Sequence, residues 1–211
     1  MANGSIIFLN GSSSSGKTTL ALALQSILTE PFLHVALDQF RDGMPAAYRG
    51  LNSPPGTCGH AGLNVVPMRR DGLSFTDIQF GPMGLTMLKG MRRAIAALAK
   101  AGNNVIIDDI IMRPEFLTDY VLVMQSFDVL FVAVCCPLEE INRREAVRPG
   151  RFPGTALGHF EAVHAHGMYD VQVDTLHQSP TECALQVLQR WQDREHPSAF
   201  KKLTELNRSL A

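Results

Sequence analysis

A glycine- and serine-rich segment at residues 11–18 constrains the fold more than any other feature of the chain. It reads GSSSSGKT and matches the pattern G-x-x-x-x-G-K-[ST] at every fixed position. A short apolar run at residues 6–9 precedes it, and a helical pattern with Leu20, Leu24 and Leu28 on one face follows it. A buried strand, a glycine-rich loop and an amphipathic helix in this order predict a loop whose backbone N–H groups converge on phosphate oxygens.

The alternative for this segment is a glycine–serine turn that caps a helix by chance. The strand before it and the helix after it favour a nucleotide-binding loop. In that interpretation Lys17 adds a positive charge near the β- and γ-phosphates, and Thr18 offers a hydroxyl ligand to Mg²⁺, which prefers oxygen.

Compact apolar runs alternate with helical patterns along the rest of the chain. Further strands are expected at residues 33–37, 105–107, 129–134 and 169–173, and further helices at residues 83–101, 114–124, 156–165 and 180–194. This alternation predicts βαβ units, and hence an α/β protein with a three-layer, doubly wound, five-stranded parallel sheet. Ligands of such sheets bind beyond the carboxyl ends of the strands.

We expect one domain over residues 1–195, followed by a C-terminal extension at residues 196–211 that forms an extra helix or a loose tail. Residues 43–82 carry five prolines and several glycines, which predicts an irregular segment with room for a short helix or hairpin. Long connections of this kind are often lids or binding loops, so this segment is the expected acceptor-binding part of the domain.

Two acidic positions follow predicted strands. Asp108 directly follows the apolar run at residues 105–107, as a Mg²⁺-binding carboxylate would, whereas Asp109 should point to the opposite face; an ordinary acidic loop is the alternative. Asp38 ends the second strand, which we expect to lie beside the first. It fits either a general base that accepts the proton of an attacking alcohol or the N-cap of a helix, and the residues leave both open.

An arginine-rich segment covers residues 138–155. Arg144, Arg148 and Arg151 are spaced to share one face of a helix, if the helix continues past Pro149. Guanidinium groups bind phosphate oxygens and stabilise the charge of phosphoryl transfer, so we interpret the segment as a lid over the nucleotide. The alternative is a solvated helix face paired with neighbouring glutamates.

Composition limits the partners. The formal net charge is −1, which removes the usual electrostatic drive for nucleic-acid binding. No run approaches the ~20 apolar residues of a membrane span, so no membrane partner is expected. The four cysteines form no metal-binding pair and read as free thiols of a cytoplasmic protein. His164 and His166 lack the spacing of metal ligands and read as surface or packing residues. The oligomeric state stays open, with a homo-oligomer as one alternative.

Several strings together resemble chloramphenicol 3-O-phosphotransferases. They are IIFLNGSSSSGKTTLALALQ, PFLHVALDQFRDGMP, VIIDDI, NRREAVRPGRFPGTA, YDVQVDT and SPTECA, within residues 5–192. The likeness is interrupted at about residues 46–72. The resemblance implies a P-loop NTPase fold like those of nucleoside and shikimate kinases, ATP with Mg²⁺, and phosphorylation of a hydroxyl group on a chloramphenicol-like antibiotic.

The resemblance also implies roles for residues at matching positions. Asp38 would be the general base, with Lys17, Arg144 and Arg148 as the other catalytic residues, and Thr18 and Asp108 would hold the metal. The expected nucleotide-binding set is Gly11, Ser12, Ser13, Ser14, Ser15, Gly16, Lys17, Thr18, Thr19, Arg144, Arg151 and Thr175. The alternatives are a metabolic kinase of the shikimate or gluconate type, a toxin-type kinase acting on a nucleotide sugar, and an ATP-binding switch protein without acceptor chemistry.

Overall fold

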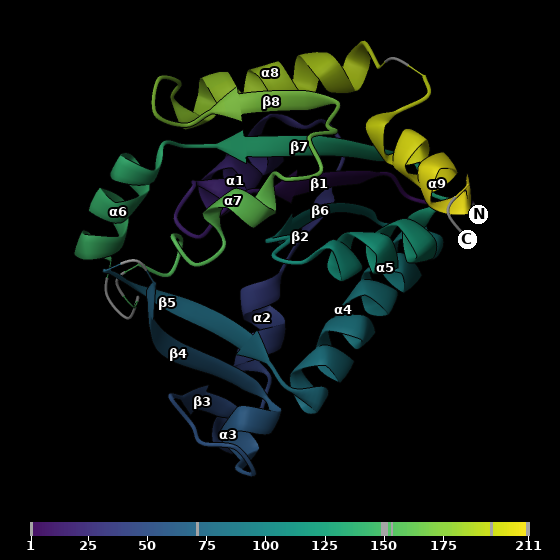
Figure 1. The fold of residues 1–211 in the computed structure, drawn as a ribbon. Helices are drawn as coiled ribbons and strands as arrows, with labels where there is room; N and C mark the ends of the chain where they lie inside the picture. Colours follow the sequence, from purple (N-terminus) through teal and green to yellow (C-terminus); the bar gives the residue numbers. More distant parts are fainter. Residues whose placement is uncertain (1, 71, 149–151, 153, 195, 210–211) are drawn as a thin grey trace.

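The computed structural model describes residues 2–70, 72–148, 152, 154–194 and 196–209. Its main sheet contains five parallel strands in the order β2-β6-β1-β7-β8 (Figure 1). These strands are β1 (Ile6–Asn10), β2 (Phe32–Ala36), β6 (Asn104–Asp109), β7 (Val129–Cys135) and β8 (Val171–Asp174). The prediction of a five-stranded parallel sheet is therefore confirmed.

Helices cover both faces of this sheet, which gives the three expected layers. On one face lie α1 (Lys17–Ile27) and α8 (Pro180–Gln192), and on the other lie α4 (Pro82–Lys100), α5 (Pro114–Met124) and α9 (Ala199–Ser209). Successive residues of β1 alternate between the two: Ile6 and Phe8 pack toward α4 and α5, whereas Ile7 and Leu9 pack toward α1 and α8. Because both faces are buried, the strand reads as a continuous apolar run.

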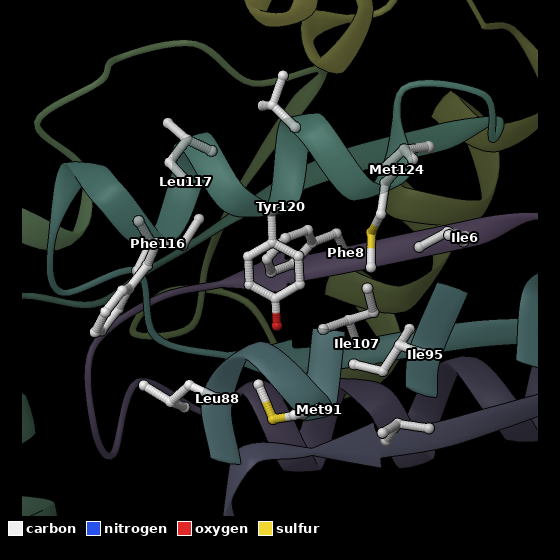
Figure 2. Close-up of a cluster of buried hydrophobic side chains, with 14 of the residues drawn as sticks. Ile6, Phe8, Leu88, Met91, Ile95, Ile107, Phe116, Leu117, Tyr120 and Met124 are labelled. Carbon is white, nitrogen blue, oxygen red and sulfur yellow. The ribbon is translucent and has the colours of Figure 1, made fainter. Parts of the chain in front are cut away.

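The core on the α4 and α5 side is centred on Tyr120, which is fully buried (Figure 2). Its ring packs on Phe8 with 4.6 Å between the ring centroids. Leu88, Met91 and Ile95 reach the same cluster from α4, at the spacing that places residues on one helix face. Residues 196–211, expected as an extension, contribute α9, whose Phe200 is buried in this cluster.

The strand order corrects one expectation. We expected β2 to lie beside β1, but β6 lies between them. In the register of β2 with β6, Ala36 is opposite Asp108, and in the register of β6 with β1, Asp108 is opposite Leu9. The carboxyl end of β6 is therefore flanked on one side by the loop after β1, residues 11–18, which we call the phosphate loop, and on the other side by the residues after β2.

Residues 43–82 are more regular than predicted, and they contain both a short helix and a hairpin, the two elements that the prediction allowed for. They form a 3₁₀ turn (Ala46–Tyr48), β3 (Arg49–Leu51), α3 (Cys58–Ala61) and a hairpin of β4 (Leu63–Arg70) and β5 (Leu73–Phe80). The three strands build a separate sheet in the order β3-β4-β5. In Figure 1 this small sheet lies apart from the main sheet, with α2 (Leu37–Asp42) between them.

Three smaller points complete the fold. The helix expected at residues 156–165 is limited to α7 (Phe160–Val163), while α6 (Leu138–Val147) ends where its arginine-rich sequence reaches Arg148. All four cysteines are free thiols. In the part of the chain that the structure describes, every helix is too short or too polar to cross a bilayer.

Candidate active site

The loop between β1 and α1 has a backbone that few residues adopt. Ser14 has a φ of 59° and Gly16 a φ of 98°, both in the left-handed region, which a serine occupies only when its surroundings hold it there. A Cβ atom on Gly11 would lie 2.5 Å from the carbonyl oxygen of Val134, so only glycine fits between the loop and β7. The first turn of α1 carries no acidic residue, which leaves its N-terminal dipole available to an anion.

Side chains hold the loop by its carbonyl oxygens. Lys17 Nζ donates to Gly11 O at 3.0 Å and to Ser12 O at 2.8 Å, and Thr175 Oγ1 donates to Ser15 O at 2.7 Å. Ser15 O and the N–H of Gly16 belong to the same peptide group, and the C=O and N–H of a trans peptide point in opposite directions. Because Ser15 O points toward Thr175, the N–H of Gly16 points away from Thr175. Gly16 lines the cavity described below, where this donor is available to an anion.

Three hydroxyl groups of the loop, on Ser13, Ser14 and Ser15, are buried and have no hydrogen-bond partner within the described residues. Buried polar groups without a partner are rare in native proteins. Phosphate oxygens accept hydrogen bonds, so the residues of this loop fit a bound nucleotide.

At the end of β6, the carboxylate of Asp108 is shared by three side chains. Thr18 Oγ1 donates to its Oδ2 atom at 2.6 Å, His34 Nε2 lies 3.4 Å from the same oxygen, and Lys17 Nζ lies 3.9 Å from Oδ1. Burial alone would raise the pKa of Asp108, but the hydrogen bonds from His34 and Thr18 and the charge of Lys17 outweigh it and lower the pKa below its usual value. Asp108 is therefore an ionised carboxylate beside a hydroxyl oxygen, a donor set that suits Mg²⁺.

Asp109 points to the other face of β6 and takes a structural position. Its Oδ2 atom accepts a hydrogen bond of 2.6 Å from the Tyr120 hydroxyl, and Oδ1 accepts one of 2.7 Å from the N–H of Ile110. Burial raises the pKa of Asp109 despite these bonds. The two adjacent aspartates thus face opposite sides of the sheet, as alternation along a strand requires.

Asp38 lies in the first turn of α2, two residues beyond the N-cap position, which Ala36 occupies. The N-cap alternative for Asp38 is therefore wrong. Its Oδ1 atom accepts a hydrogen bond of 2.7 Å from Arg41, one turn later on the same helix, and its side chain is 44% exposed. Asp38 lines the same cavity as the phosphate loop and Asp108.

The arginines after β7 separate into different positions. Arg144 donates from Nη2 to Thr175 O at 2.8 Å and from Nη1 to Ser14 O at 3.4 Å, while its Nε bonds Glu140 at 2.8 Å. Arg144 thus ties α6 to the phosphate loop and to the turn after β8. Arg148 follows the end of α6 and lines the cavity. Arg151, part of the predicted nucleotide-binding set, lies outside the described residues.

One cavity of about 690 Å³ brings most of the predicted residues together. It is lined by the predicted residues Ser13, Ser14, Gly16, Lys17, Thr18, Thr19, Asp38, Asp108, Arg144, Arg148 and Thr175. Gly11, Ser12 and Ser15 lie behind this lining and contribute the carbonyls that bind Lys17 and Thr175.

Sequence reasoning missed three side chains at or next to this cavity. His34 could have been noticed as a polar residue near the carboxyl end of an otherwise apolar strand. Gln178 lines the far end of the cavity and bonds the N–H of Asp174 at 2.9 Å. His159 accepts a hydrogen bond of 3.1 Å from the N–H of Ser13, and no local pattern marks it. His164 and His166 pack against Tyr169 and Phe131.

The family described as chloramphenicol phosphotransferase-like protein matches residues 4–192. This match covers the phosphate loop, both strand-end aspartates and the arginine segment. The chain belongs to the chloramphenicol phosphotransferase-like family. It is thus a member of a kinase-like O-phosphotransferase family, and the resemblance seen in the sequence is confirmed.

A protein of Mycobacterium tuberculosis, named as a proposed O-phosphotransferase in two strains, is 34% identical over 211 aligned positions. The alignment covers 96% of this chain and 89% of the relative. It therefore includes the small sheet, which lies inside the chain, and reaches beyond the region that the family description covers.

Solved kinases share the fold at low sequence identity. The Mycobacterium tuberculosis APS kinase in complex with AMPPNP and APS has a TM-score of 0.57 and 17% identity, covering 91% of this chain and 99% of the kinase. A Sinorhizobium meliloti gluconokinase has a TM-score of 0.56 and 15% identity, covering 100% and 99%. Shikimate kinase from Aquifex aeolicus has a TM-score of 0.51 and 15% identity, covering 89% and 96%. At these identities the likeness establishes the P-loop kinase fold.

Proposed function

We propose that the protein transfers the γ-phosphoryl group of ATP, with Mg²⁺, to a hydroxyl group of a small molecule. One observation carries this proposal: the phosphate loop, the Thr18–Asp108 pair and the Asp38 carboxylate all line a single cavity of about 690 Å³. A nucleotide-binding switch would need the first two features, but a carboxylate at the acceptor side is what group transfer to an alcohol requires.

The nucleotide would bind with its phosphates on the loop. The N–H of Gly16 and the unpartnered hydroxyls of the loop serines offer donors, and the start of α1 adds its partial positive charge. Lys17 now bonds carbonyls of its own loop. A flexible lysine at that position can exchange these bonds for the more strongly charged phosphate oxygens.

Thr18 and Asp108 would hold Mg²⁺, through the threonine hydroxyl and the ionised carboxylate. When bound, the ion would neutralise negative charge on the phosphates. Arg148 would contribute positive charge from the α6 side of the cavity, whereas Arg144 acts through the loop, because its guanidinium is already committed to Thr175 and Glu140.

In the transfer step, the acceptor hydroxyl oxygen forms a bond to the γ-phosphorus. The bond from that phosphorus to the bridging β–γ oxygen breaks, and ADP leaves with its electron pair. The proton of the hydroxyl passes to the carboxylate of Asp38, which Arg41 orients through their 2.7 Å hydrogen bond.

The acceptor that we propose is a chloramphenicol-like antibiotic, after the description of the family. Among the described side chains of residues 40–80, the charges near Asp38 support a neutral acceptor. Arg41 pairs with Asp38 and Asp42, and Arg49 approaches Asp42 at 3.8 Å, so these arginines already have carboxylate partners. Arg69 lines a different, shallower cavity on the hairpin of β4 and β5. An anionic acceptor would instead require cations free to meet it.

We also propose that residues 1–195 work as one kinase domain, with residues 43–82 on the acceptor side and residues 138–155 as the lid. The bonds of Arg144 to Ser14 and Thr175 support this division, because they connect α6 directly to the nucleotide side of the cavity.

A transfer assay tests the proposed function. The purified protein is incubated with ATP, Mg²⁺ and chloramphenicol, ADP release is followed, and the phosphate monoester is identified by phosphorus NMR. We expect ADP release that depends on the acceptor. Transfer to gluconate, shikimate or a nucleotide sugar but not to chloramphenicol would keep the kinase and replace the acceptor. ATP binding by calorimetry without transfer to any acceptor would favour the switch protein.

A further inference from the structure

His159 is a buried histidine that contacts the phosphate loop from the protein side. It is 6% exposed, and its Nε2 atom accepts a hydrogen bond of 3.1 Å from the N–H of Ser13, 146 residues earlier in the chain. An imidazole nitrogen that accepts an N–H must be unprotonated, so the ring carries its proton on Nδ1. His159 thus supplies a buried acceptor to a donor of the loop backbone.

The neutral ring is the stable state at this place. Burial and the nearby charge of Lys17 lower the pKa of His159 to about 3. Over the range in which a kinase works, the Nε2 lone pair therefore remains available to Ser13.

The segment that carries His159 is itself fixed against the small sheet. The N–H of Thr76 in β5 donates to Gly154 O at 3.1 Å. A Cβ atom on Gly158 would lie 2.5 Å from Thr76 O, so the segment packs on β5 too closely for any side chain there. The N–H of His159 then bonds Ala156 O at 3.1 Å, which closes a turn and orients the ring. These contacts fix the position of His159 relative to β5.

The loop needs such a support at this point. Ser14, the residue after Ser13, has a left-handed backbone that is unfavourable for a serine and persists only where its neighbours hold it. Lys17, Thr175 and Arg144 hold carbonyl oxygens of the loop. His159 instead binds an N–H group, that of Ser13. This N–H belongs to the same peptide as Ser12 O, which Lys17 binds, so His159 and Lys17 hold this peptide from opposite sides.

We infer that His159 is a positioning residue of the phosphate loop: its Nε2 atom fixes the N–H of Ser13 and thereby keeps Ser14 and the following donors in the conformation that receives a nucleotide phosphate. This inference rests on the proposed nucleotide binding. Its consequence is that the small sheet supports the phosphate loop through the segment from Gly154 to His159, although the two are far apart in sequence.

The experiment compares three variants by calorimetry with Mg²⁺ and a non-hydrolysable ATP analogue. H159F keeps a ring but has no acceptor, and H159Q places an amide oxygen where Nε2 lies. H166F removes a nearby histidine whose contacts within the described residues are with Phe131, Met168 and Tyr169, away from the phosphate loop. We expect the Kd of H159F to rise about tenfold and that of H159Q to stay within about threefold of wild type. The Kd of H166F should stay within about twofold.

The outcomes separate this inference from the function on which it rests. If the wild type binds no nucleotide at millimolar concentrations, the proposed function fails. If the wild type binds and H159F binds equally well, or if H166F is weakened as much as H159F, the positioning role is wrong. If H159F does not fold, H159N replaces it, because its shorter amide does not reach Ser13; equal affinities of H159N and H159Q would then overturn the inference. At saturating ATP, kcat should change less than Kd, which a general loss of structure would not produce.

Discussion

The hydroxyl of Thr18 lies 2.6 Å from the Oδ2 atom of Asp108, although the two residues are 90 positions apart in the sequence. Thr18 is in the first turn of α1 and Asp108 is near the end of β6, so this bond joins the phosphate loop to the neighbouring strand. The register of β1 with β6 aligns the carboxyl ends of the two strands, with Leu9 opposite Asp108. This alignment brings the Thr18 hydroxyl and the Asp108 carboxylate together at one edge of the sheet.

Replacing Asp108 with asparagine should raise the Mg²⁺ concentration required for transfer by about 10- to 100-fold, because the charged metal ligand is lost while the side-chain shape is kept. A Mg²⁺ titration of the transfer rate measures this effect. The partner residue is tested by Thr18→Val, with Thr86→Val as the matched control. Within the described part of the chain, the Thr86 hydroxyl bonds only a carbonyl oxygen of its own helix α4. An unchanged Mg²⁺ requirement in both Asp108→Asn and Thr18→Val would contradict the metal site.

Replacing Asp38 with asparagine should lower kcat by about 10²- to 10⁴-fold, because an amide cannot accept the hydroxyl proton. The affinity for ATP should stay near that of wild type, since Asp38 is placed on the acceptor side. Asp42→Asn is the control, because Asp42 lies on the same helix and also pairs with Arg41. If Asp42→Asn is as slow as Asp38→Asn, the loss reflects the helix and its charges rather than a general base.

Replacing Arg144 with lysine should weaken ATP binding by about five- to tenfold, because a lysine cannot bond Ser14, Thr175 and Glu140 at once. Its neighbour Arg143 is 70% exposed and, among the residues that the structure describes, bonds Glu140 alone. Arg143→Lys should therefore bind ATP as wild type does. Calorimetry measures both affinities: an unchanged affinity in Arg144→Lys would mean that positive charge suffices without the fork geometry, and equal losses in the two variants would mean that the bonds to Ser14 and Thr175 are not the cause.

Replacing Tyr120 with phenylalanine should lower the free energy of unfolding by about 1–3 kcal/mol, because the buried carboxylate of Asp109 loses a hydrogen-bond donor. The ring stays, so the packing on Phe8 seen in Figure 2 is preserved. Urea unfolding measures the change. Tyr48→Phe serves as the control, since Tyr48 is only half buried. A stability equal to that of wild type would mean that Asp109 is protonated and needs no donor from Tyr120.

Acid should destabilise the protein through His159. Its pKa is about 3 in the folded protein, against an ordinary value of 6.5. Between these values the unfolded chain binds a proton that the folded chain does not, so stability falls as the pH falls from 6.5 toward 3. The contribution is at most about 1.4 kcal/mol per pH unit. His159→Gln should show a shallower loss between pH 7 and pH 5 in urea unfolding, and identical slopes would contradict the assignment.

The sequence was sufficient for the features that are encoded locally. The phosphate loop occupies one continuous segment, and Asp108 directly follows an apolar run, so both were predictable from neighbouring residues. The burial of β1 and the five parallel strands also followed from pattern alone. The neighbour of β2 did not, because apolar runs buried on both faces carry no information about which strand pairs with which.

The small sheet could not be predicted from the sequence, because Pro67 lies within one of its strands. Pro67 lies within β4 opposite Thr76, and the N–H of Thr76 bonds Gly154 instead of β4. The pair of Pro67 and Thr76 therefore needs no N–H donor from Pro67 toward β5. On the other side of β4, β3 ends at Leu51, opposite Val65, so it does not require a donor from Pro67 either. A proline that usually argues against a strand is thus tolerated here. His159 could not be found either, because its partner is a backbone N–H far away in the chain.

The strands of the small sheet, β3, β4 and β5, all lie between α2 and α4 in the sequence. Because the small sheet is one continuous insertion between α2 and α4, it could be exchanged for another segment while the main sheet and its helices stay as they are. Such an exchange has one structural condition. The new segment must present backbone without a projecting side chain at the place where Thr76 now contacts Gly154 and Gly158. A side chain projecting there would displace the turn that carries His159, and with it the hydrogen bond from His159 to the N–H of Ser13.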